Sequence, residues 1–555
     1  MSFLRKIFNY PAKVKDSPST AWVDHLSGMD DLSAVELSVK KLGHDFKKLT
    51  FQNTQNLKAL ILVDEKTHSI VERITAHFIH IENINEELKA RISSVVYSYH
   101  RQLFIIYLNL IKHHALIQES TLHILLSRAI RNATQTIKWR HYCYQHSPAN
   151  IWLQISEVYK IAEQHSLLNA KVQSYPDQEP ISLSSAYIQA CMLGTLETTS
   201  LKTQQIELVC KLLSTWTAKI TIDSAYHAEQ HLFYVDTASD RPAQRIRNFK
   251  SADSYRYWCF EEVNATIELC ILLMQYKISP KQAGMKALIN SKYAAETLET
   301  LRNVWSKTDY KRQRRSEQRF KNTVSVNIAY GFNNICHQIR QYERIKSSEI
   351  ASAKIHADYF ESDPDKQSRL DKYDRFANAS NIIYLKPNTS KANIVDQSDH
   401  GLGLEVTKPL QAIDLATLVS ITDHCQKIGM QLGLVRSIRS LGNGQHRLGI
   451  ELLSHLATWV TFKNISLAAK LARGSFADSA TNTGFDELPE AFHALYIPKE
   501  YAISKQETLI IPKLQYSISD ILKGELLGQE LLIKLHRAVA SDSDWTQVTF
   551  STVIN

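Results

Sequence analysis

The sequence predicts an α+β multidomain protein with an N-terminal stack of helices, an antiparallel β-barrel that carries a partly helical insertion, and a small C-terminal β-rich region. Three observations support this. The chain has 555 residues, enough for several domains. Only four of its 16 glycines lie in residues 1–300, and glycine is costly inside helices but useful in β-turns. The spacing of apolar residues changes from a helical period to alternation after residue 320.

Composition and charge exclude several classes of protein. Apolar residues make up 44% and charged residues 22% of the chain, which is ordinary for a globular protein. The formal net charge of +9 is small for this length and does not by itself indicate a nucleic-acid or membrane binder. The seven cysteines contain no Cys-x-x-Cys pair and are typical of reduced thiols. Without a signal peptide or an apolar run long enough to cross a bilayer, we expect a cytoplasmic protein with no transmembrane segment.

Residues 1–300 are expected to form the helical domain. Apolar residues recur at helical spacing over 83–130, and Trp152, Ile155, Tyr159 and Ala162 do so over 151–164. A stack of antiparallel helices is the main expectation, and a repeat solenoid is the alternative, although no clean 34-residue period is present. Three further segments complete the domain: a loop at 173–185, an irregular stretch with a short strand at 233–258, and a helix at 277–289 capped by Ser279 before Pro280.

The β-rich part begins with a basic leader. Residues 307–321 hold seven basic and two acidic residues. We expect a β-barrel domain over 305–470, an insertion at about 333–380, and a C-terminal β-rich domain over 485–555. The expected strands lie at 322–332, 381–387, 391–406 (two strands), 429–454 (a hairpin turning at Asn443-Gly444), 459–463, 508–516, 531–539 and 545–554, and the insertion comprises a helix at 333–355 and a polar loop at 356–376.

Two short motifs in this part carry candidate chemistry. The first is Arg315-x-x-x-Arg319, in the basic leader just before a strand. The second is Asp396-x-Ser398-x-x-Gly401, a turn expected between two strands. Arginine forks pair with phosphates and with base edges, and a carboxylate accepts paired N–H donors. The two motifs are 77 residues apart, so their meeting requires strand 322–332 to pair with the strand near 391 across the insertion.

These motifs, followed by the hairpin GLVRSIRSLGNGQHRLGIELLS at 433–454, resemble the PilZ domain, a bacterial receptor module for cyclic di-GMP. The resemblance covers about residues 310–465. It implies a receptor or effector that binds cyclic di-GMP and passes this signal to a helical region that contacts a protein partner, with no enzymatic activity and no cofactor. This chain departs from the pattern in one respect: its two motifs lie farther apart than in compact PilZ domains, and the insertion accounts for the difference.

The resemblance assigns roles to six residues. Arg315 and Arg319 would clasp the ligand by bidentate contacts to guanine or phosphate. Asp396 would accept from the N1–H and N2–H₂ edge of guanine, and Ser398 would bond to the same base or to its own turn. Gly401 would allow a positive φ where the next strand begins. Arg314 would add a phosphate contact.

Several alternatives stay open at this stage. The barrel could be a degenerate scaffold that does not bind nucleotide and acts through protein contacts. The basic leader could bind a nucleic-acid polymer, although no stacking-aromatic platform accompanies it. Two histidine clusters, His227/His231 and His141-x-Cys143 with His146, have metal-like spacing. We expect both to be structural, and Gly401-x-Gly403 is only part of a dinucleotide-binding loop.

Overall fold

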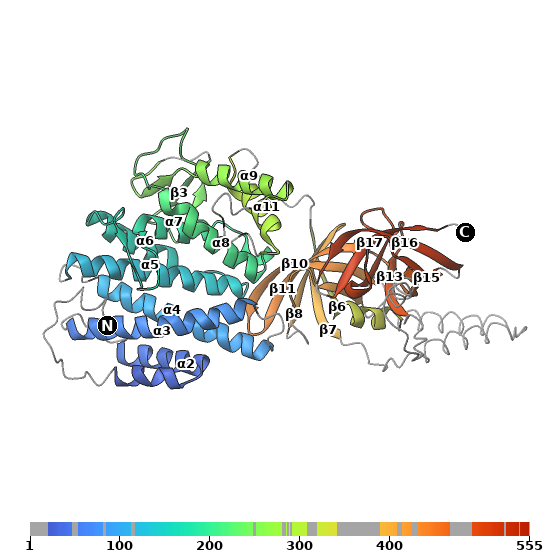
Figure 1. Cartoon of the computed structure of the whole chain (residues 1–555), viewed down its shortest axis with the longest axis horizontal. Coiled ribbons are helices and arrows are strands. Elements are labelled where there is room, and N and C mark those ends of the chain that lie inside the picture. Colours follow the sequence, from blue (N-terminus) through green and yellow to red (C-terminus); the bar gives the residue numbers. More distant parts are fainter. Residues whose placement is uncertain are drawn as a thin grey trace, which may run out of the picture. The chain divides into compact units, whose positions relative to one another are not determined.

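The computed structural model divides into two compact units, Met1–Arg314 and Arg315–Asn555 (Figure 1). The first unit is helical and the second consists of antiparallel β-barrels, so the chain is an α+β multidomain protein. The structure describes residues 20–46, 54–80, 85–112, 117–247, 251–279, 285, 288, 291–307, 319–340, 389–407, 413–423, 430–466, 491–526, 529–542 and 544–553.

The helical unit is built from long helices that pack side by side. The α-helices are α2 (Asp31–Lys41), α3 (Thr54–His80), α4 (Glu86–Ile111), α5 (Glu119–Tyr142), α6 (Ile151–Gln164), α7 (Leu183–Leu193), α8 (Thr203–Trp216), α9 (Glu261–Gln275) and α11 (Ala294–Trp305). Shorter turns are η1 (Ala21–Gly28), η2 (Leu42–Phe46), η4 (Thr198–Ser200) and η5 (Thr217–Lys219). Helix α4 packs against α2 and α5, and α5 packs against α6 and α7.

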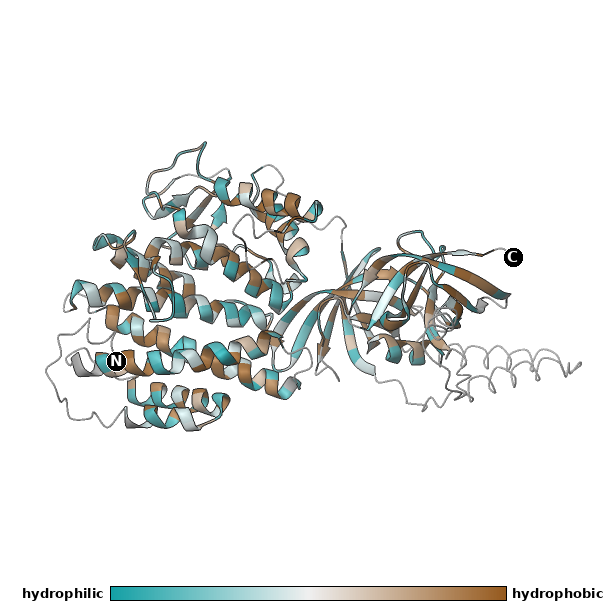
Figure 2. Ribbon diagram, viewed as in Figure 1, coloured by the Kyte–Doolittle hydropathy of each residue, from teal (hydrophilic) through white to brown (hydrophobic). Residues whose placement is uncertain are grey.

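Local sequence explains where these helices form. Helix α6 has the bounds that the apolar spacing predicted, and Trp152, Ile155, Tyr159 and Ala162 are all buried. The periodic stretch 83–130 is split between α4 and α5. Asp30 caps α2 by accepting a hydrogen bond of 3.0 Å from the Ser33 amide. Figure 2 shows hydrophobic residues recurring along the helices between hydrophilic ones, as this packing requires.

A buried ionic cluster ties the helices to the segment at 173–185. Asp64 on α3 is 1% exposed and Arg128 on α5 is fully buried, with 3.3 Å between the Asp64 Oδ2 and Arg128 Nη1 atoms. The Tyr175 hydroxyl donates to both Asp64 oxygens, at 2.9 and 3.0 Å. The hydroxyl of Tyr107 on α4 donates to the same carboxylate. A buried charge is tolerated only when it is paired in this way.

Two irregular segments contain more structure than the sequence predicted. The expected loop at 173–185 contains β2 (Ile181–Ser182), which pairs with β1 (Lys171–Val172), and its last three residues begin α7. The segment 233–258 forms a three-stranded sheet in the order β4-β3-β5, with β3 (Phe233–Asp236), β4 (Gln244–Arg245) and β5 (Tyr255–Trp258). The predicted helix at 277–289 lies mostly outside the described residues.

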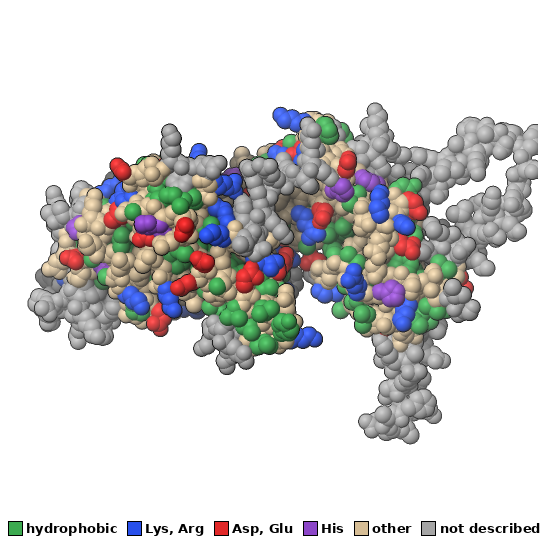
Figure 3. All heavy atoms as spheres, turned by 90° about the horizontal axis from the view of Figure 1, so that it is seen from above, with side chains coloured by type: hydrophobic (Ala, Val, Ile, Leu, Met, Phe, Trp, Pro, Cys, Tyr) green, Lys and Arg blue, Asp and Glu red, His purple; other side chains and the backbone are tan. Residues whose placement is uncertain are grey.

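Helix α9 presents apolar residues to solvent as well as to the core. Val263, Ile267, Cys270 and Ile271 face inward and are buried. Leu269, Leu272 and Tyr276, at helical spacing, are 46%, 50% and 71% exposed. Figure 3 views the molecule from the side on which α9 lies in Figure 1, and hydrophobic side chains gather on that face of the helical unit.

The second unit contains two closed six-stranded barrels. The first consists of β6 (Phe320–Tyr330), β7 (Thr389–Ser398), β8 (Gly401–Thr407), β9 (Leu418–Asp423), β10 (Gln431–Gly442) and β11 (Gln445–Ser454). The second consists of β12 (Thr458–Asn464), β13 (Phe492–Ile497), β14 (Thr508–Pro512), β15 (Ile521–Leu526), β16 (Gln529–Ser541) and β17 (Trp545–Thr552), with the short turn η7 (Lys513–Gln515) after β14.

The first barrel confirms the pairing that the candidate site needs. Strands β6 and β7 are antiparallel neighbours, with Val326 opposite Ala392, although the insertion separates them in sequence. The predicted hairpin is β10–β11, and its turn residues Asn443 and Gly444 have φ angles of 52° and 73°. Both values are the positive angles that a two-residue hairpin turn requires. Residues 332–340 of the predicted insertion are helical, and 341–388 lie outside the described residues.

The second barrel begins earlier in the chain than the sequence predicted. Strand β12, expected in the first β-domain, pairs with β13 and β15 of the second barrel. The C-terminal region also contains β13 and β15, which the sequence analysis did not predict. Counted along the chain from one to six, the strands of both barrels close in the same circular order, 1-2-3-6-5-4. The second barrel therefore repeats the topology of the first.

The two barrels share a small hydrophobic core. It includes Phe332, Ile335 and Ile339 from the helix at 332–340, Leu432 from β10, and Trp545 from β17. The Phe332 amide donates to Asp544 Oδ2 at 3.1 Å, which ties the start of this helix to the second barrel. Figure 2 shows hydrophobic and hydrophilic residues alternating along the strands. Among the described residues, no helix is long and apolar enough to cross a membrane.

Candidate functional site

The structure brings together four of the six residues that the motifs singled out. Arg319, immediately before β6, donates from Nη1 to Asp396 Oδ1 near the end of β7. Ser398 ends β7 and Gly401 begins β8, and the Ser398 hydroxyl donates to the Gly401 carbonyl at 3.4 Å. Pairing of β6 with β7 closes the 77-residue separation, so the insertion does not hold the two motifs apart. Arg314 and Arg315 lie outside the described residues.

Irregular pairing aims the Asp396 side chain away from the barrel interior. Ile394 is fully buried inside the barrel and, with regular alternation, Asp396 would point inward as well. A bulge at Val395 places Ile394 opposite Leu404 but Asp396 opposite Gly403. Because Leu404 faces the core, Gly403 and its partner Asp396 face the outer surface. Bulges commonly redirect one side chain in this way.

Asp396 belongs to a row of directly opposed residues that crosses five strands, and strand pairing next to this row is irregular in two further places. The row runs Lys321–Asp396–Gly403–Gly449–Ser437 across β6, β7, β8, β11 and β10. Register shifts border it in the β6–β7 pairing and in the β10–β11 pairing. The barrel is thus locally distorted along the line that presents the carboxylate.

Gly403 makes room for that carboxylate. A Cβ atom at Gly403 would lie 2.6 Å from Asp396 Oδ1 and 2.8 Å from its Cγ. The expectation of a positive φ at Gly401 is wrong, because the φ angle of this residue is not positive. A Cβ at Gly401 would instead lie 3.0 Å from the Ile450 carbonyl oxygen and 3.4 Å from Arg319 Nη2. Close approach of neighbouring groups, and not backbone conformation, therefore favours glycine at both positions.

A second arginine holds the other oxygen of Asp396. Arg447 on β11 donates from Nη2 to Asp396 Oδ2 at 2.5 Å. Its Nη1 lies 3.9 Å from Oε1 of Glu405, the residue directly opposite on β8. Burial of Asp396, which is 8% exposed, would raise its pKa, but hydrogen bonds and charge attraction from Arg319 and Arg447 outweigh burial and lower it. The carboxylate is therefore ionised at neutral pH.

Sequence reasoning missed Arg447, although a signal was present. Alternation along β11 places Arg447, Gly449 and Glu451 on one face, opposite Glu405, Gly403 and Gly401 of β8. Strand period and the glycine spacing would have placed Arg447 beside the aspartate, had the register been known. On the same face, Arg436 Nε donates to Glu451 Oε2 at 2.5 Å.

Contacts within the helical unit hold the residues at the start of the basic leader in place. Trp305, the last residue of α11, is fully buried, and its indole N–H donates to Thr195 at 2.8 Å. The Arg245 guanidinium donates to the carbonyls of Ser306, at 2.7 Å, and Lys307, at 3.3 Å. These contacts secure the leader where it leaves the helical unit, and Arg319 lies near its other end, just before β6.

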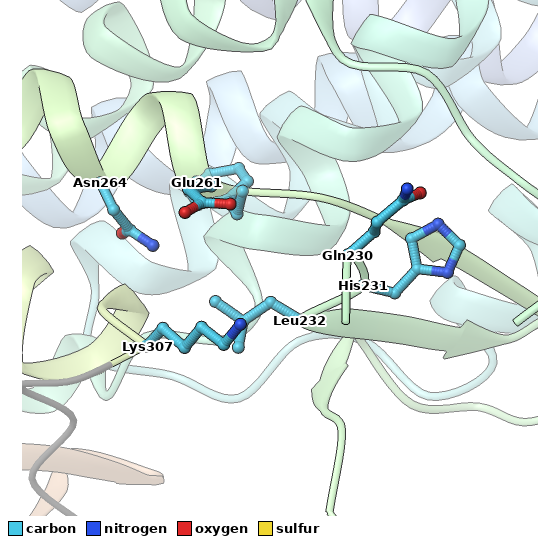
Figure 4. A pocket seen from close by; sticks show the side chains of 7 residues that line it. Gln230, His231, Leu232, Glu261, Asn264 and Lys307 are labelled. Carbon is cyan, nitrogen blue, oxygen red and sulfur yellow. The ribbon is translucent and has the colours of Figure 1, made fainter. Parts of the chain in front are cut away.

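A small pocket in the helical unit lies beside this point (Figure 4). It is lined by Gln230, His231, Leu232, Phe260, Glu261, Asn264 and Lys307. The Lys307 amine donates to the Glu229 carbonyl at 3.3 Å. His231 Nδ1 accepts from the His227 amide at 3.1 Å, and its Nε2 lies 2.9 Å from Asp223 Oδ2.

Both ring nitrogens of His231 are therefore engaged, which supports a structural role for the His227/His231 pair. His141, in the other histidine cluster, is buried, and burial lowers its pKa to about 4. Within the part of the chain that the structure describes, no group of three or more His, Cys, Asp or Glu side chains could hold a metal ion.

The site as a whole is suited to recognition. Two guanidinium groups, a carboxylate and a hydroxyl converge on the outer face of a rigid barrel. Guanidinium groups bind phosphate oxygens or base acceptors, and a carboxylate accepts two parallel N–H donors. This combination fits a ligand that carries both phosphates and a donor edge.

Comparison with known protein families gives a match to the N-terminal part of the chain. A family model described as the N-terminal domain of the cyclic-di-GMP receptor FimW matches residues 17–228. No curated protein matches the chain. The matched segment lies within the helical unit and runs from before η1 to beyond η5. The N-terminal part of this chain is thus similar to a domain of a cyclic-di-GMP receptor.

Proposed function

We propose that the chain is a cytoplasmic receptor for cyclic di-GMP, which binds to the first barrel through Arg319, Asp396 and Ser398. One observation carries the proposal: Arg319 and Asp396 are hydrogen-bonded on the barrel surface although 77 residues separate them. Arg315, four residues before Arg319 in the sequence, would complete the clasp together with Arg314.

Two separate parts of the chain support the same ligand. The PilZ-like motifs lie within residues 310–465, in the barrel unit. The match to the receptor family lies at 17–228, in the helical unit. The two segments do not overlap, so neither indication depends on the other.

The chemistry of the site favours guanine over adenine. The Watson–Crick edge of guanine presents N1–H and N2–H₂ donors, which match the two oxygens of the ionised Asp396 carboxylate. Adenine presents an N1 acceptor on that edge, and its lone pair would face the carboxylate. The arginines would pair with the phosphates and with the guanine O6 and N7 acceptors.

A calorimetric titration of cyclic di-GMP into the full-length chain tests the proposal. We expect saturable binding, its loss in Asp396→Ala and Arg319→Ala, and no effect of Arg537→Ala, which removes an exposed arginine from the second barrel. Cyclic di-AMP should not bind. Binding that survives Asp396→Ala would contradict the assigned site.

Other results would point to other functions. If cyclic di-GMP gives no heat and no thermal shift with the folded chain, a non-enzymatic scaffold that acts through protein contacts becomes the better explanation. If single-stranded nucleic acid binds instead, with an affinity that falls steeply with salt and ignores Asp396, the basic leader is a polymer-binding segment.

We further propose that ligand binding transmits a signal without bond chemistry. The leader starts after the secured end of α11, and Arg315 lies in it between that point and Arg319. Contact between Arg315 and the ligand would restrain the leader and change how the helical unit meets its protein partner. Trypsin tests this, because residues 307–321 hold seven cleavable basic residues. Cyclic di-GMP should slow cleavage there in the wild type but not in Asp396→Ala.

A further inference from the structure

Asp396 is occupied in the ligand-free chain. Arg319 holds Oδ1 and Arg447 holds Oδ2, and Gly403 and the bulge at Val395 fix where the carboxylate lies. A guanidinium fork and the donor edge of guanine both present parallel N–H groups, and both fit the two oxygens of one carboxylate. Each oxygen already accepts one arginine N–H, so guanine and the arginines compete for the same two oxygens, and a guanine edge gains its full pair of hydrogen bonds when one guanidinium leaves.

Of the two arginines, Arg447 is the one that can leave Asp396 at a low cost in free energy. Its Nη1 already lies 3.9 Å from Glu405 Oε1, and the two residues face each other directly across β11 and β8. The side chains of Arg447 and Glu405 are 36% and 43% exposed, so a change of rotamer meets little packing. Arg319 differs, because Asp396 is the carboxylate with which it pairs among the described residues.

We propose that Arg447 is a built-in competitor of the ligand: it occupies the guanine position on Asp396 in the free chain and moves to Glu405 when cyclic di-GMP binds. This inference rests on the proposed function and adds a regulatory residue to the same site. Arg447 sets the concentration at which the receptor responds, since the ligand must displace it. Glu405 lowers the cost of displacement because it gives the guanidinium a second partner.

The competition predicts effects of opposite sign for two residues that contact each other. Arg447→Ala removes the competitor and should tighten binding, whereas Glu405→Gln removes the alternative partner and should weaken it. Partly exposed ion pairs contribute up to about 1 kcal/mol, so each effect should be about three- to fivefold in Kd. In an Arg447→Ala background, Glu405→Gln should have no effect, since there is no guanidinium left to accommodate.

Loss of a positive charge could by itself weaken binding of an anionic ligand, and the barrel offers a matched control. Arg439 on β10 lies directly opposite Arg447 and is exposed. Arg439→Ala removes the same charge from the same face without freeing Asp396. The informative quantity is therefore the Kd of Arg447→Ala relative to that of Arg439→Ala.

The experiment is a calorimetric titration of cyclic di-GMP into the full-length wild type, the three single variants and the Arg447→Ala/Glu405→Gln double variant, each checked for folding by circular dichroism. We expect Arg447→Ala to bind about three- to fivefold more tightly than Arg439→Ala, with Glu405→Gln neutral in the double variant. Binding by Arg447→Ala that is equal to or weaker than binding by Arg439→Ala would overturn the competitor role. An effect of Glu405→Gln without Arg447 would do the same. Wild type that does not bind would overturn the receptor proposal itself.

Discussion

Replacing Gly403 by alanine tests whether the placement of the Asp396 carboxylate is what the site depends on. The new Cβ would lie 2.6, 2.8 and 3.0 Å from Oδ1, Cγ and Oδ2 of Asp396, and contacts below 3.0 Å essentially never occur. Two arginines hold the carboxylate, so the clash cannot be relieved without breaking at least one of these pairs. Overpacking of this kind costs about 1–3 kcal/mol of stability.

Two assays separate the effects of this substitution. Chemical denaturation should show the stability loss, and calorimetry should show affinity for cyclic di-GMP reduced by at least about tenfold, or ~1.4 kcal/mol. Gly401→Ala is the graded comparison, since its Cβ would come no closer than 3.0 Å to any atom. In an Asp396→Ala background the clash disappears, so Gly403→Ala should cost about 1 kcal/mol less stability there. Equal costs in both backgrounds, or unchanged binding by Gly403→Ala, would refute the reasoning.

Three further predictions concern charge and pH. Arg128→Met leaves the buried Asp64 carboxylate without its cation and should destabilise the helical unit by about 3–5 kcal/mol, measured by urea unfolding; a change within ±0.5 kcal/mol would contradict the role of this pair. His100 is buried and its pKa is lowered from 6.5 to about 3, with desolvation as the main cause. The unfolded chain therefore takes up a proton first as the pH falls below 6.5, and the helical unit should lose about 1.4 kcal/mol per pH unit from this residue down to about pH 3. His100→Gln should flatten that slope in urea titrations at several pH values, and an unchanged slope would exclude His100 as its source. Asp396 has a lowered pKa, so it stays ionised as the pH falls, and affinity for cyclic di-GMP should be constant between about pH 8 and 5; a decline that starts near pH 6 would point to another group.

Much of the architecture could be predicted because local signals were strong. Glycine distribution separated a helical part from a β part, and helical spacing gave the bounds of α6. Alternation gave β6, and the Asn443-Gly444 turn gave the β10–β11 hairpin. In each case a short stretch of sequence contains the whole signal.

The unpredicted elements depend on contacts between distant residues. Strands β9, β13 and β15 are six residues each, and a short apolar or mixed run does not distinguish a strand from a buried turn. The sequence predicts β12 as a strand, but only its pairing with β13 and β15 assigns it to the second barrel.

In the candidate site, too, features with a local sequence signal could be predicted and features that depend on strand pairing could not. Asp396 and Arg319 could be named from their motifs, because each motif is local. The position of Arg447 follows from the β8–β11 register, and the direction of Asp396 follows from a bulge that no sequence pattern marks. The space at Gly403 is likewise visible only once β7 and β8 are paired.

A crystal structure of the chain with cyclic di-GMP would test the central claim most directly. The account predicts a guanine edge hydrogen-bonded to the Asp396 carboxylate on the outer face of the first barrel, with Arg319 on the ligand and Arg447 paired with Glu405. Ligand density elsewhere, with Arg447 still on Asp396, would contradict it.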